Sequence, residues 1–137
     1  MTLCDAGPLF ALVDPRQGDL HERCKRALPS LPSPLLTTWP SFTEAMYLAH
    51  RSGGWPMQDL LWKFVSASVL LLHDLGASET ERMRALMEQY RDTPMDLADA
   101  SLVAVAEKLD QTRIFTLDHH FRVYRLEGIK PFDIVPA

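Results

Sequence analysis

The chain opens with the stretch that decides its fold, Met1-Thr-Leu-Cys-Asp-Ala-Gly-Pro-Leu-Phe-Ala-Leu-Val13. Residues 2–4 form a short apolar stretch, which predicts a buried strand that ends at Asp5. Gly7 and Pro8 then introduce a helical run over residues 9–13, because proline suits the first turn of a helix. A strand, an acidic residue and a helix are therefore predicted in direct succession.

The same alternation continues along the chain. Apolar runs predict strands at residues 35–38, 69–73, 114–117 and 132–135. Apolar spacing and capping residues predict helices at residues 19–28, 40–51, 55–67 and 78–91, and from a cap at Asp96 to about Leu109. Ser78 is the predicted N-cap of its helix, since Glu81 follows at the spacing of a capping box.

Strands that alternate with helices indicate a parallel sheet covered on both faces. We therefore expect the α/β class, with a mostly parallel central sheet of about five strands flanked by helices. The length of 137 residues fits a single three-layer domain over residues 1–137, which is large enough to bury a proper core.

The composition is that of a soluble globular protein, with 47% hydrophobic and 23% charged residues. No apolar run approaches the roughly 18 residues of a membrane span, and the N-terminus lacks the basic and apolar segments of a signal peptide. We expect no membrane partner and a cytoplasmic location. Cys4 and Cys24 are too few for a disulfide framework or a zinc site, so buried free thiols are predicted.

The formal net charge of −4 argues against a protein that grips nucleic acid with a surface coated in basic residues. It does not exclude a nuclease, because carboxylates gathered to hold a metal make such a protein acidic. Contact with nucleic acid would then depend on a local basic patch.

Four acidic residues fall where a parallel sheet places its functional crevice, beyond the carboxyl ends of the strands. Asp5 and Asp118 directly follow predicted strands, and Asp99 lies in the first turn of its helix. Glu44 lies one turn into a helix that follows a strand, among apolar neighbours. We expect these four side chains to converge on one pocket.

Convergence of this kind limits the possible functions. Two carboxylates about 4 Å apart repel by ~4 kcal/mol at an effective dielectric near 20. The cluster must take up protons or hold a cation. Ligands that are all oxygen favour Mg²⁺ or Mn²⁺ over zinc. Such ions suit phosphodiester hydrolysis, because they activate water and stabilise charge on phosphoryl oxygens.

Each acid also has a structural explanation when taken alone. Asp5 could be a turn residue at a strand end, and Asp99 could complement the helix dipole. Asp118, beside His119 and His120, could lie in a turn. Asp96 is interpreted mainly as an N-cap, with a supporting role at the pocket as the alternative. Only the joint pattern favours the functional interpretation.

Other side chains are candidates for nucleic-acid contact. Arg122 and Arg125 follow Asp118 by four and seven residues, so a helix there would place both on one face to hold phosphates; a solvated surface is the alternative. His119 and His120 are interpreted as loop residues. The three tryptophans could stack on bases or belong to the core or a dimer interface: Trp39, Trp55 and Trp62.

Four segments resemble the PIN-domain ribonucleases, and in particular the VapC-type toxins of VapBC toxin–antitoxin pairs. They are Leu-Cys-Asp-Ala-Gly-Pro-Leu-Phe-Ala-Leu-Val-Asp from residue 3, Thr-Glu-Ala around residue 44, Met-Asp-Leu-Ala-Asp-Ala-Ser-Leu-Val-Ala-Val-Ala-Glu from residue 95, and Ile-Phe-Thr-Leu-Asp-His-His-Phe from residue 114. Their order and spacing fit nearly the whole chain. One mild departure is Gly7, two residues after the first aspartate. The family usually has a small or hydroxyl residue there, and glycine could remove one hydroxyl contact near the metal.

The resemblance implies that Asp5, Glu44, Asp99 and Asp118 are the catalytic, metal-binding acids. It also implies an endoribonuclease that depends on Mg²⁺ or Mn²⁺, forms a homodimer, and is silenced by an antitoxin whose tail covers the site. Two alternatives stay open, an RNA-processing nuclease that is not a toxin and an inactive PIN fold that binds partners. A receiver-like switch fits poorly, because only Asp5 follows the first strand and residues 116–118 offer no lysine.

Overall fold

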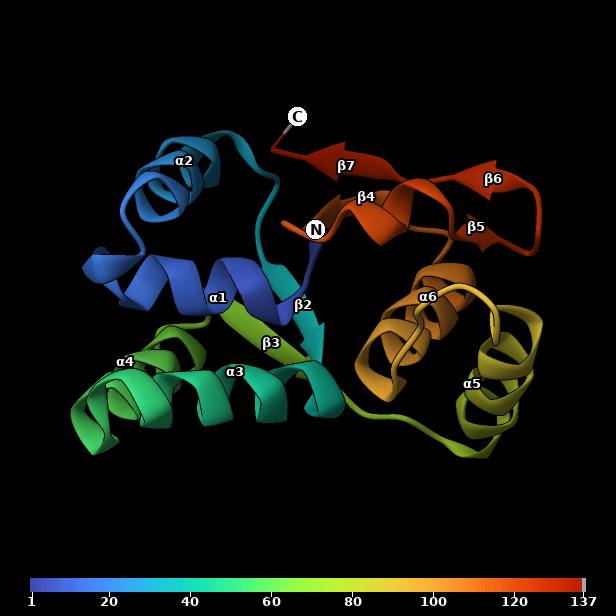
Figure 1. Ribbon diagram of the computed structural model, residues 1–137, viewed down its shortest axis with the longest axis horizontal. Coiled ribbons are helices and arrows are strands. Elements are labelled where there is room, and N and C mark those ends of the chain that lie inside the picture. The colour runs from blue at the N-terminus through green and yellow to red at the C-terminus, as the bar shows by residue number, and fades with distance from the viewer. Residues whose placement is uncertain (137) are drawn as a thin grey trace.

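A five-stranded sheet runs through the centre of the computed structural model, which describes residues 1–136 (Figure 1). In spatial order its strands are β3 (Leu70–His73), β2 (Leu35–Thr38), β1 (Thr2–Cys4), β4 (Arg113–Phe115) and β7 (Asp133–Val135). Every neighbouring pair is parallel. The predicted parallel sheet of about five strands is therefore confirmed.

Helices connect these strands at positions close to the predicted ones. They are α1 (Ala6–Val13), α2 (Asp19–Ala27), α3 (Trp39–Gly53), α4 (Trp55–Ser66), α5 (Ala77–Gln89) and α6 (Leu97–Leu109). Short 3₁₀ turns lie at η1 (Pro15–Gln17), η2 (Leu28–Ser30) and η3 (His119–Arg122). A small antiparallel pair, β5 (Arg125–Leu126) and β6 (Lys130–Pro131), precedes β7 and was not predicted.

Side chains alternate between the two faces of the sheet and so divide the core in two. Leu3, Leu36 and Ile114 pack on the face covered by α5 and α6. Cys4, Leu35 and Phe115, each one position away from these, pack on the face covered by α1 to α4. The result is the predicted three-layer α/β arrangement, with helices on both faces of the sheet (Figure 1).

Hydrogen bonds join the elements at the carboxyl edge of the sheet. The backbone N–H of Asp5 donates to the carbonyl oxygen of Phe115 (2.9 Å), which extends the pairing of β1 with β4. The hydroxyl of Thr38, at the end of β2, lies 2.6 Å from the hydroxyl of Ser101 in α6. The start of α6 is thereby fixed against the ends of the central strands.

One local prediction is wrong, and one arrangement considered for Arg122 and Arg125 does not occur. Ser78 is not the N-cap of α5, because the helix begins at Ala77 and the Ser78 hydroxyl instead donates to Glu79 (2.8 Å), which is already held by Lys108. Arg122 and Arg125 do not share a helical face. The chain makes only the short turn η3, since the burial of Phe121 and Tyr124 in the core draws it into β5 instead.

Other predictions from composition can be checked on residues 1–136. Cys4 and Cys24 are buried free thiols, as predicted, and burial raises the pKa of Cys24 to about 11. No helix in this range has the length and apolar character needed to cross a bilayer. The tryptophans do not belong to the core, because Trp39, Trp55 and Trp62 are 45%, 61% and 39% exposed.

Asp14 joins the end of α1 to the end of α3, and its removal should destabilise the fold. Its carboxylate is fully buried and accepts hydrogen bonds from the Ser52 hydroxyl (2.6 Å) and the Arg16 backbone N–H (3.1 Å). Asp14→Ala should lower the free energy of unfolding in urea by about 1–3 kcal/mol, because buried donors lose their acceptor. Asp59→Ala, which removes a solvent-exposed i,i+4 ion pair, should cost about 0.5 kcal/mol or less.

This prediction has a pH signature. Hydrogen bonds, chiefly the one from Ser52, lower the pKa of Asp14 to about 2. The ionised carboxylate therefore stabilises the fold above its ordinary pKa of 3.8, and that stability is lost as pH falls towards 2. The difference between wild type and Asp14→Ala should shrink over this window. A difference that is constant from pH 7 to pH 2 would contradict this role.

Candidate functional site

Three of the four predicted acids meet at the carboxyl edge of the sheet. Asp5 follows β1, Asp118 lies just beyond β4, and Asp99 is in the first turn of α6. One carboxylate oxygen from each lies within 4.8 Å of the other two. The convergence expected for these three side chains is what the fold produces.

Asp5 is the most deeply placed of the three. One of its carboxylate oxygens accepts the N–H of Ala6 (2.8 Å), so the side chain also caps α1. The other accepts the hydroxyl of Thr116 (2.8 Å). The same threonine oxygen accepts the backbone N–H of Asp118 (3.0 Å). Thr116 therefore connects two of the acids through a single hydroxyl.

Asp99 is held by the start of its own helix. Asp96 and Asp99 form a reciprocal capping box, with Asp99 N–H donating to Asp96 (2.8 Å) and Asp96 N–H donating to Asp99 (3.1 Å). The predicted N-cap role of Asp96 is thus confirmed. The hydroxyl of Tyr124, which also donates to the carbonyl of Pro94, lies 3.3 Å from the Asp99 carboxylate.

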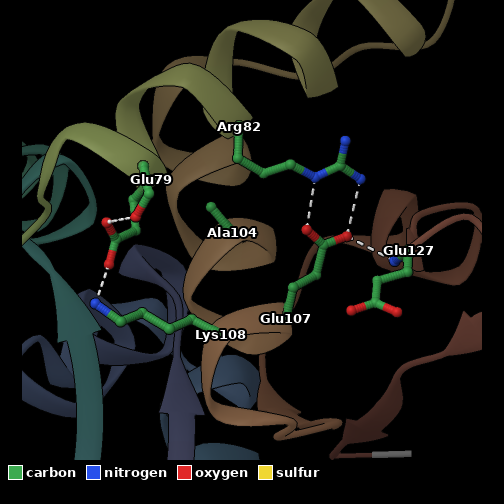
Figure 2. A pocket seen from close by; sticks show the side chains of 7 residues that line it. Glu79, Arg82, Ala104, Glu107, Lys108 and Glu127 are labelled. Carbon is green, nitrogen blue, oxygen red and sulfur yellow. Dashed lines mark hydrogen bonds and ion pairs between the residues drawn. The ribbon is translucent and has the colours of Figure 1, made fainter.

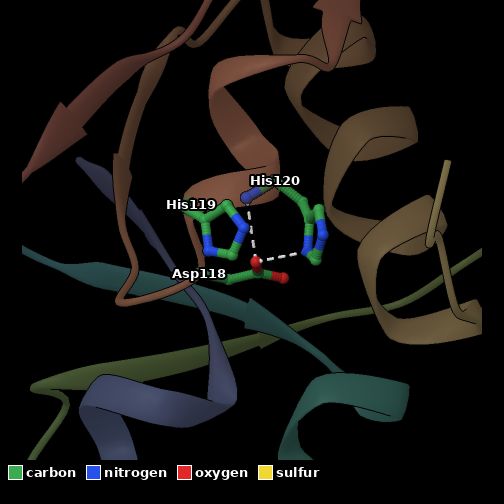
Figure 3. A group of neighbouring side chains, drawn as sticks. All are labelled: Asp118, His119 and His120. Atoms are coloured by element: carbon green, nitrogen blue, oxygen red, sulfur yellow. Dashed lines mark hydrogen bonds and ion pairs between the residues drawn. The ribbon is translucent and has the colours of Figure 1, made fainter.

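Asp118 is oriented by the turn that follows it. One carboxylate oxygen accepts the backbone N–H of His120 (2.9 Å) and lies 2.8 Å from Nδ1 of the same residue. Figure 3 shows the imidazoles of His119 and His120 side by side next to this carboxylate, with ring centroids 4.3 Å apart. Ligand atoms of these three neighbours also lie within 4.8 Å of one another, so nitrogen donors border the acidic group.

Glu44 does not belong to the close group. It lies on α3, and its side chain is exposed, in contrast to the partly apolar surroundings expected from its neighbours in sequence. Partial burial, followed by the charges of Asp5, Asp96 and Asp118, raises its pKa. Glu44 is therefore at the rim, within the electrostatic field of the other acids. It lines a mostly apolar groove of about 620 Å³ between the starts of α3 and α6.

The carboxylates of Asp5, Asp99 and Asp118 lie close together without a lysine or arginine partner in residues 1–136. Burial, together with the charge of Asp118, raises the pKa of Asp5 to about 6. Burial and the charge of Asp96 raise the pKa of Asp99 to about 7. Within residues 1–136, no lysine or arginine forms an ion pair with Asp5, Asp99 or Asp118. Oxygen donors of this kind fit a hard divalent cation such as Mg²⁺ or Mn²⁺.

A second charged cavity differs in having its charges paired. It has a volume of about 260 Å³ and lies between α5 and α6 (Figure 2). There the guanidinium of Arg82 binds Glu107 through two hydrogen bonds (2.6 and 2.9 Å), and Lys108 pairs with Glu79. These pairs brace two helices against each other. The acidic edge of the sheet is therefore the stronger candidate for a functional site.

Comparison with known proteins identifies the family. A model of the PIN domain matches residues 2–126. The chain belongs to the PIN domain family. It is similar to Ribonuclease VapC26 of Mycobacterium tuberculosis, with 25% identity over 135 residues that cover 98% of this chain and 99% of that protein. The resemblance drawn from the four sequence segments is confirmed.

Solved structures share the fold of this PIN domain. VapC20 of Mycobacterium tuberculosis, described as a toxin that cleaves the sarcin–ricin loop, superposes with a TM-score of 0.83 at 18% identity over 96% of this chain and 100% of that one. A toxin–antitoxin complex from Klebsiella pneumoniae gives a TM-score of 0.61 at 21% identity, with coverage of 86% and 87%. At these identities the likeness concerns the fold.

Sequence reasoning missed the residues that orient the acids of this PIN domain. Thr116 was noted only as part of a strand, and Tyr124 was not singled out. The one local signal was the position of Thr116, two residues before Asp118 in a strand that alternates faces, which places its side chain at the same edge. Tyr124 gave no such signal, because its contact with Asp99 depends on how the core folds.

The raised pKa values predict that the metal-free protein loses stability as pH increases. A carboxyl whose pKa is higher in the folded state binds its proton more tightly there, so its contribution is present below pH 4 and is lost as pH rises through about 6 and 7. In chelator at pH 8, Asp5→Asn should be more stable than wild type, by at most on the order of 3 kcal/mol for a shift of about two pKa units.

Thermal unfolding between pH 4 and pH 8 would measure this effect. Asp92→Asn, which neutralises an exposed acid in the loop before α6, should follow the wild-type profile. Mg²⁺ or Mn²⁺ should raise the melting temperature of wild type more at pH 8 than at pH 5, because protons compete for the same oxygens. An Asp5→Asn protein that is less stable than wild type at pH 8 in chelator would contradict the assigned repulsion.

Proposed function

We propose that this PIN domain is a metal-dependent endoribonuclease that hydrolyses RNA phosphodiester bonds and acts as the toxin of a toxin–antitoxin pair. The observation that carries the proposal is the meeting of Asp5, Asp99 and Asp118 within 4.8 Å without a lysine or arginine partner in residues 1–136. The similarity to a relative named as a ribonuclease supports it.

Asp5, Asp99 and Asp118 would hold Mg²⁺ or Mn²⁺, with Glu44 completing the set from α3. The bound ion would lower the pKa of a water molecule and neutralise charge on the phosphoryl oxygens. Thr116 fixes the direction of the Asp5 carboxylate, and His120 does so for Asp118. The Tyr124 hydroxyl, which donates to the Pro94 carbonyl, lies against the Asp99 carboxylate at 3.3 Å.

Protein partners are also part of the proposal. Among solved structures of the same fold is a toxin–antitoxin complex, which supports an antitoxin that covers the site. Helices α3 and α4 expose aromatic side chains, with Tyr47 59% and Trp55 61% exposed, and such exposed apolar area is typical of surfaces that bind proteins. The homodimer and the cytoplasmic location stay predictions. Light scattering on the purified chain would test the first, and fractionation of cells the second.

The central test is cleavage of RNA by the purified protein. Wild type should cut unstructured or hairpin RNA in Mg²⁺ or Mn²⁺ and not in chelator. Asp99→Asn should lose at least about a hundredfold in rate, because one charge of an electrostatic site is removed. The asparagine oxygen can still accept the N–H of Asp96, so the start of α6 should be preserved.

The matched control is Asp92→Asn, which removes an exposed acid outside the group and should cleave at the wild-type rate. If folded wild type, free of antitoxin, cuts no RNA in either metal, the inactive partner-binding PIN fold becomes the better interpretation. If the protein cleaves a defined precursor RNA and its production does not slow the growth of cells, an RNA-processing enzyme is favoured over a toxin.

A second prediction concerns Thr116, which we regard as a positioning residue. Thr116→Val keeps the shape of the side chain but removes the hydroxyl that links Asp5 and Asp118. Loss of such an outer partner should lower the affinity for Mn²⁺ by about 10–100-fold, measured by calorimetry. Thr116→Ser retains the hydroxyl and should bind Mn²⁺ nearly as wild type does. Equal Mn²⁺ affinity in wild type and Thr116→Val would rule out this role.

A further inference from the structure

A small cleft opens beside Asp118, and Asp5 and Asp99 are not among the residues that line it. Its volume is about 170 Å³, and it lies between α2, the turn η3 and β7. Arg23, Asp118, His119 and Arg122 contribute its polar lining, and apolar side chains such as Leu117 complete it. Asp118 is therefore shared between the acidic group and this cleft.

Within residues 1–136, the side chains of the two arginines in this cleft form no ion pair, hydrogen bond or contact with an aromatic ring, unlike most other basic side chains. Eight of the fourteen basic residues form ion pairs with acids: Arg16, Lys25, Lys63, Arg82, Arg84, Lys108, Arg113 and Lys130. Arg51 lies over the ring of Tyr47, and the side chains of Arg91 and Arg125 donate to backbone carbonyls.

The remaining guanidiniums, within the part of the chain that the structure describes, are those of Arg23, Arg26 and Arg122. Arg23 and Arg122 line the cleft beside Asp118. Arg23 and Arg26 line an adjoining hollow against Pro136. Of the basic side chains without an ion pair, hydrogen bond or aromatic contact in residues 1–136, two thus lie beside Asp118, and the third lies in a hollow that shares Arg23 and Pro136 with the cleft.

We propose that Arg23 and Arg122 bind a backbone phosphate of the RNA strand, next to the bond that is cut; this rests on the ribonuclease function proposed above. An acidic site repels RNA, so the strand needs positive charge close by to remain in place. Two guanidiniums provide paired N–H donors that match phosphate oxygens. The cleft is smaller than the roughly 300–1,000 Å³ of a drug-sized ligand pocket, and suits a single charged group.

The groove that Glu44 lines does not offer the same chemistry. The groove beside Glu44 is lined by aromatic, apolar and acidic side chains, and no lysine or arginine is among the described residues that form it. A phosphate placed there would face Glu44 and Asp96 without compensation. The charge distribution therefore places the phosphate contact in the cleft beside Asp118. The sequence suggested both Arg122 and Arg125 for a phosphate contact. Only Arg122 lines this cleft, whereas Arg125 donates to backbone carbonyls.

The test is binding of a fluorescein-labelled single-stranded RNA by anisotropy, in chelator so that cleavage does not interfere. Arg23→Ala/Arg122→Ala should raise the Kd about tenfold at low salt. The slope of log Kd against log salt concentration should fall by about 0.7, since one phosphate contact to a single strand contributes about that much. Arg51→Ala/Arg91→Ala removes the same charge elsewhere and should leave Kd and slope nearly unchanged.

Cleavage kinetics and a second probe separate the outcomes. Wild type that cleaves RNA while Arg23→Ala/Arg122→Ala binds it with unchanged Kd and slope would overturn the phosphate site and leave the ribonuclease intact. Equal losses of RNA affinity in Arg23→Ala/Arg122→Ala and in Arg51→Ala/Arg91→Ala would also overturn it. The overall positive charge of the protein, and not its position in the cleft, would then account for RNA binding. The second probe is a labelled poly-glutamate peptide. If Arg23→Ala/Arg122→Ala weakens binding of this peptide and leaves RNA binding unchanged, the cleft binds an acidic protein segment and the phosphate site is overturned. If wild type neither binds nor cleaves RNA, the ribonuclease function fails with it.

Discussion

Mutual repulsion among the carboxylates of Asp5, Asp99 and Asp118 is the constraint that the surrounding structure has to satisfy. Three acids held within 4.8 Å would separate if their side chains were mobile. Each is instead held by donors that do not neutralise it: the Thr116 hydroxyl, the N–H of Asp96 and the N–H of His120. Hydrogen bonds fix the direction of the carboxylates and leave their charge available to a cation. The site stores unfavourable electrostatic energy that ligand binding relieves.

The acids serve the fold and the site together. Asp5 caps α1, Asp118 caps the turn η3, and Asp99 is the inner member of the capping box of α6. The structural interpretations that each acid allowed on its own are therefore correct, and they do not compete with the functional one. A residue that ends a strand and caps the next helix is placed at the sheet edge by local geometry alone. Local rules thus bring distant acids to the same edge without a dedicated scaffold.

This also explains how far the sequence could be interpreted. Strand ends, helix starts and the positions of Asp5, Asp99 and Asp118 follow from short-range patterns, and these were predictable. Glu44 was harder, because its apolar neighbours in sequence do not surround its carboxylate in space. The partners Thr116 and Tyr124 contact residues 111 and 25 positions away, which no local pattern encodes. A helix after Asp118, which would have placed Arg122 and Arg125 on one face, does not form, because Phe121 and Tyr124 are buried in the core.

The order of strands in the sheet has a consequence for how the protein is made. Strand β1 (Thr2–Cys4) lies between β2 and β4, and β4 (Arg113–Phe115) is synthesised long after β1. At roughly 5–20 residues per second, a ribosome needs about 6 to 24 seconds to reach residue 118. Until then Asp5 lacks Asp118, and for most of that time it also lacks the neighbouring strand β4. The acidic group therefore cannot assemble in a nascent chain that has not yet reached residue 118.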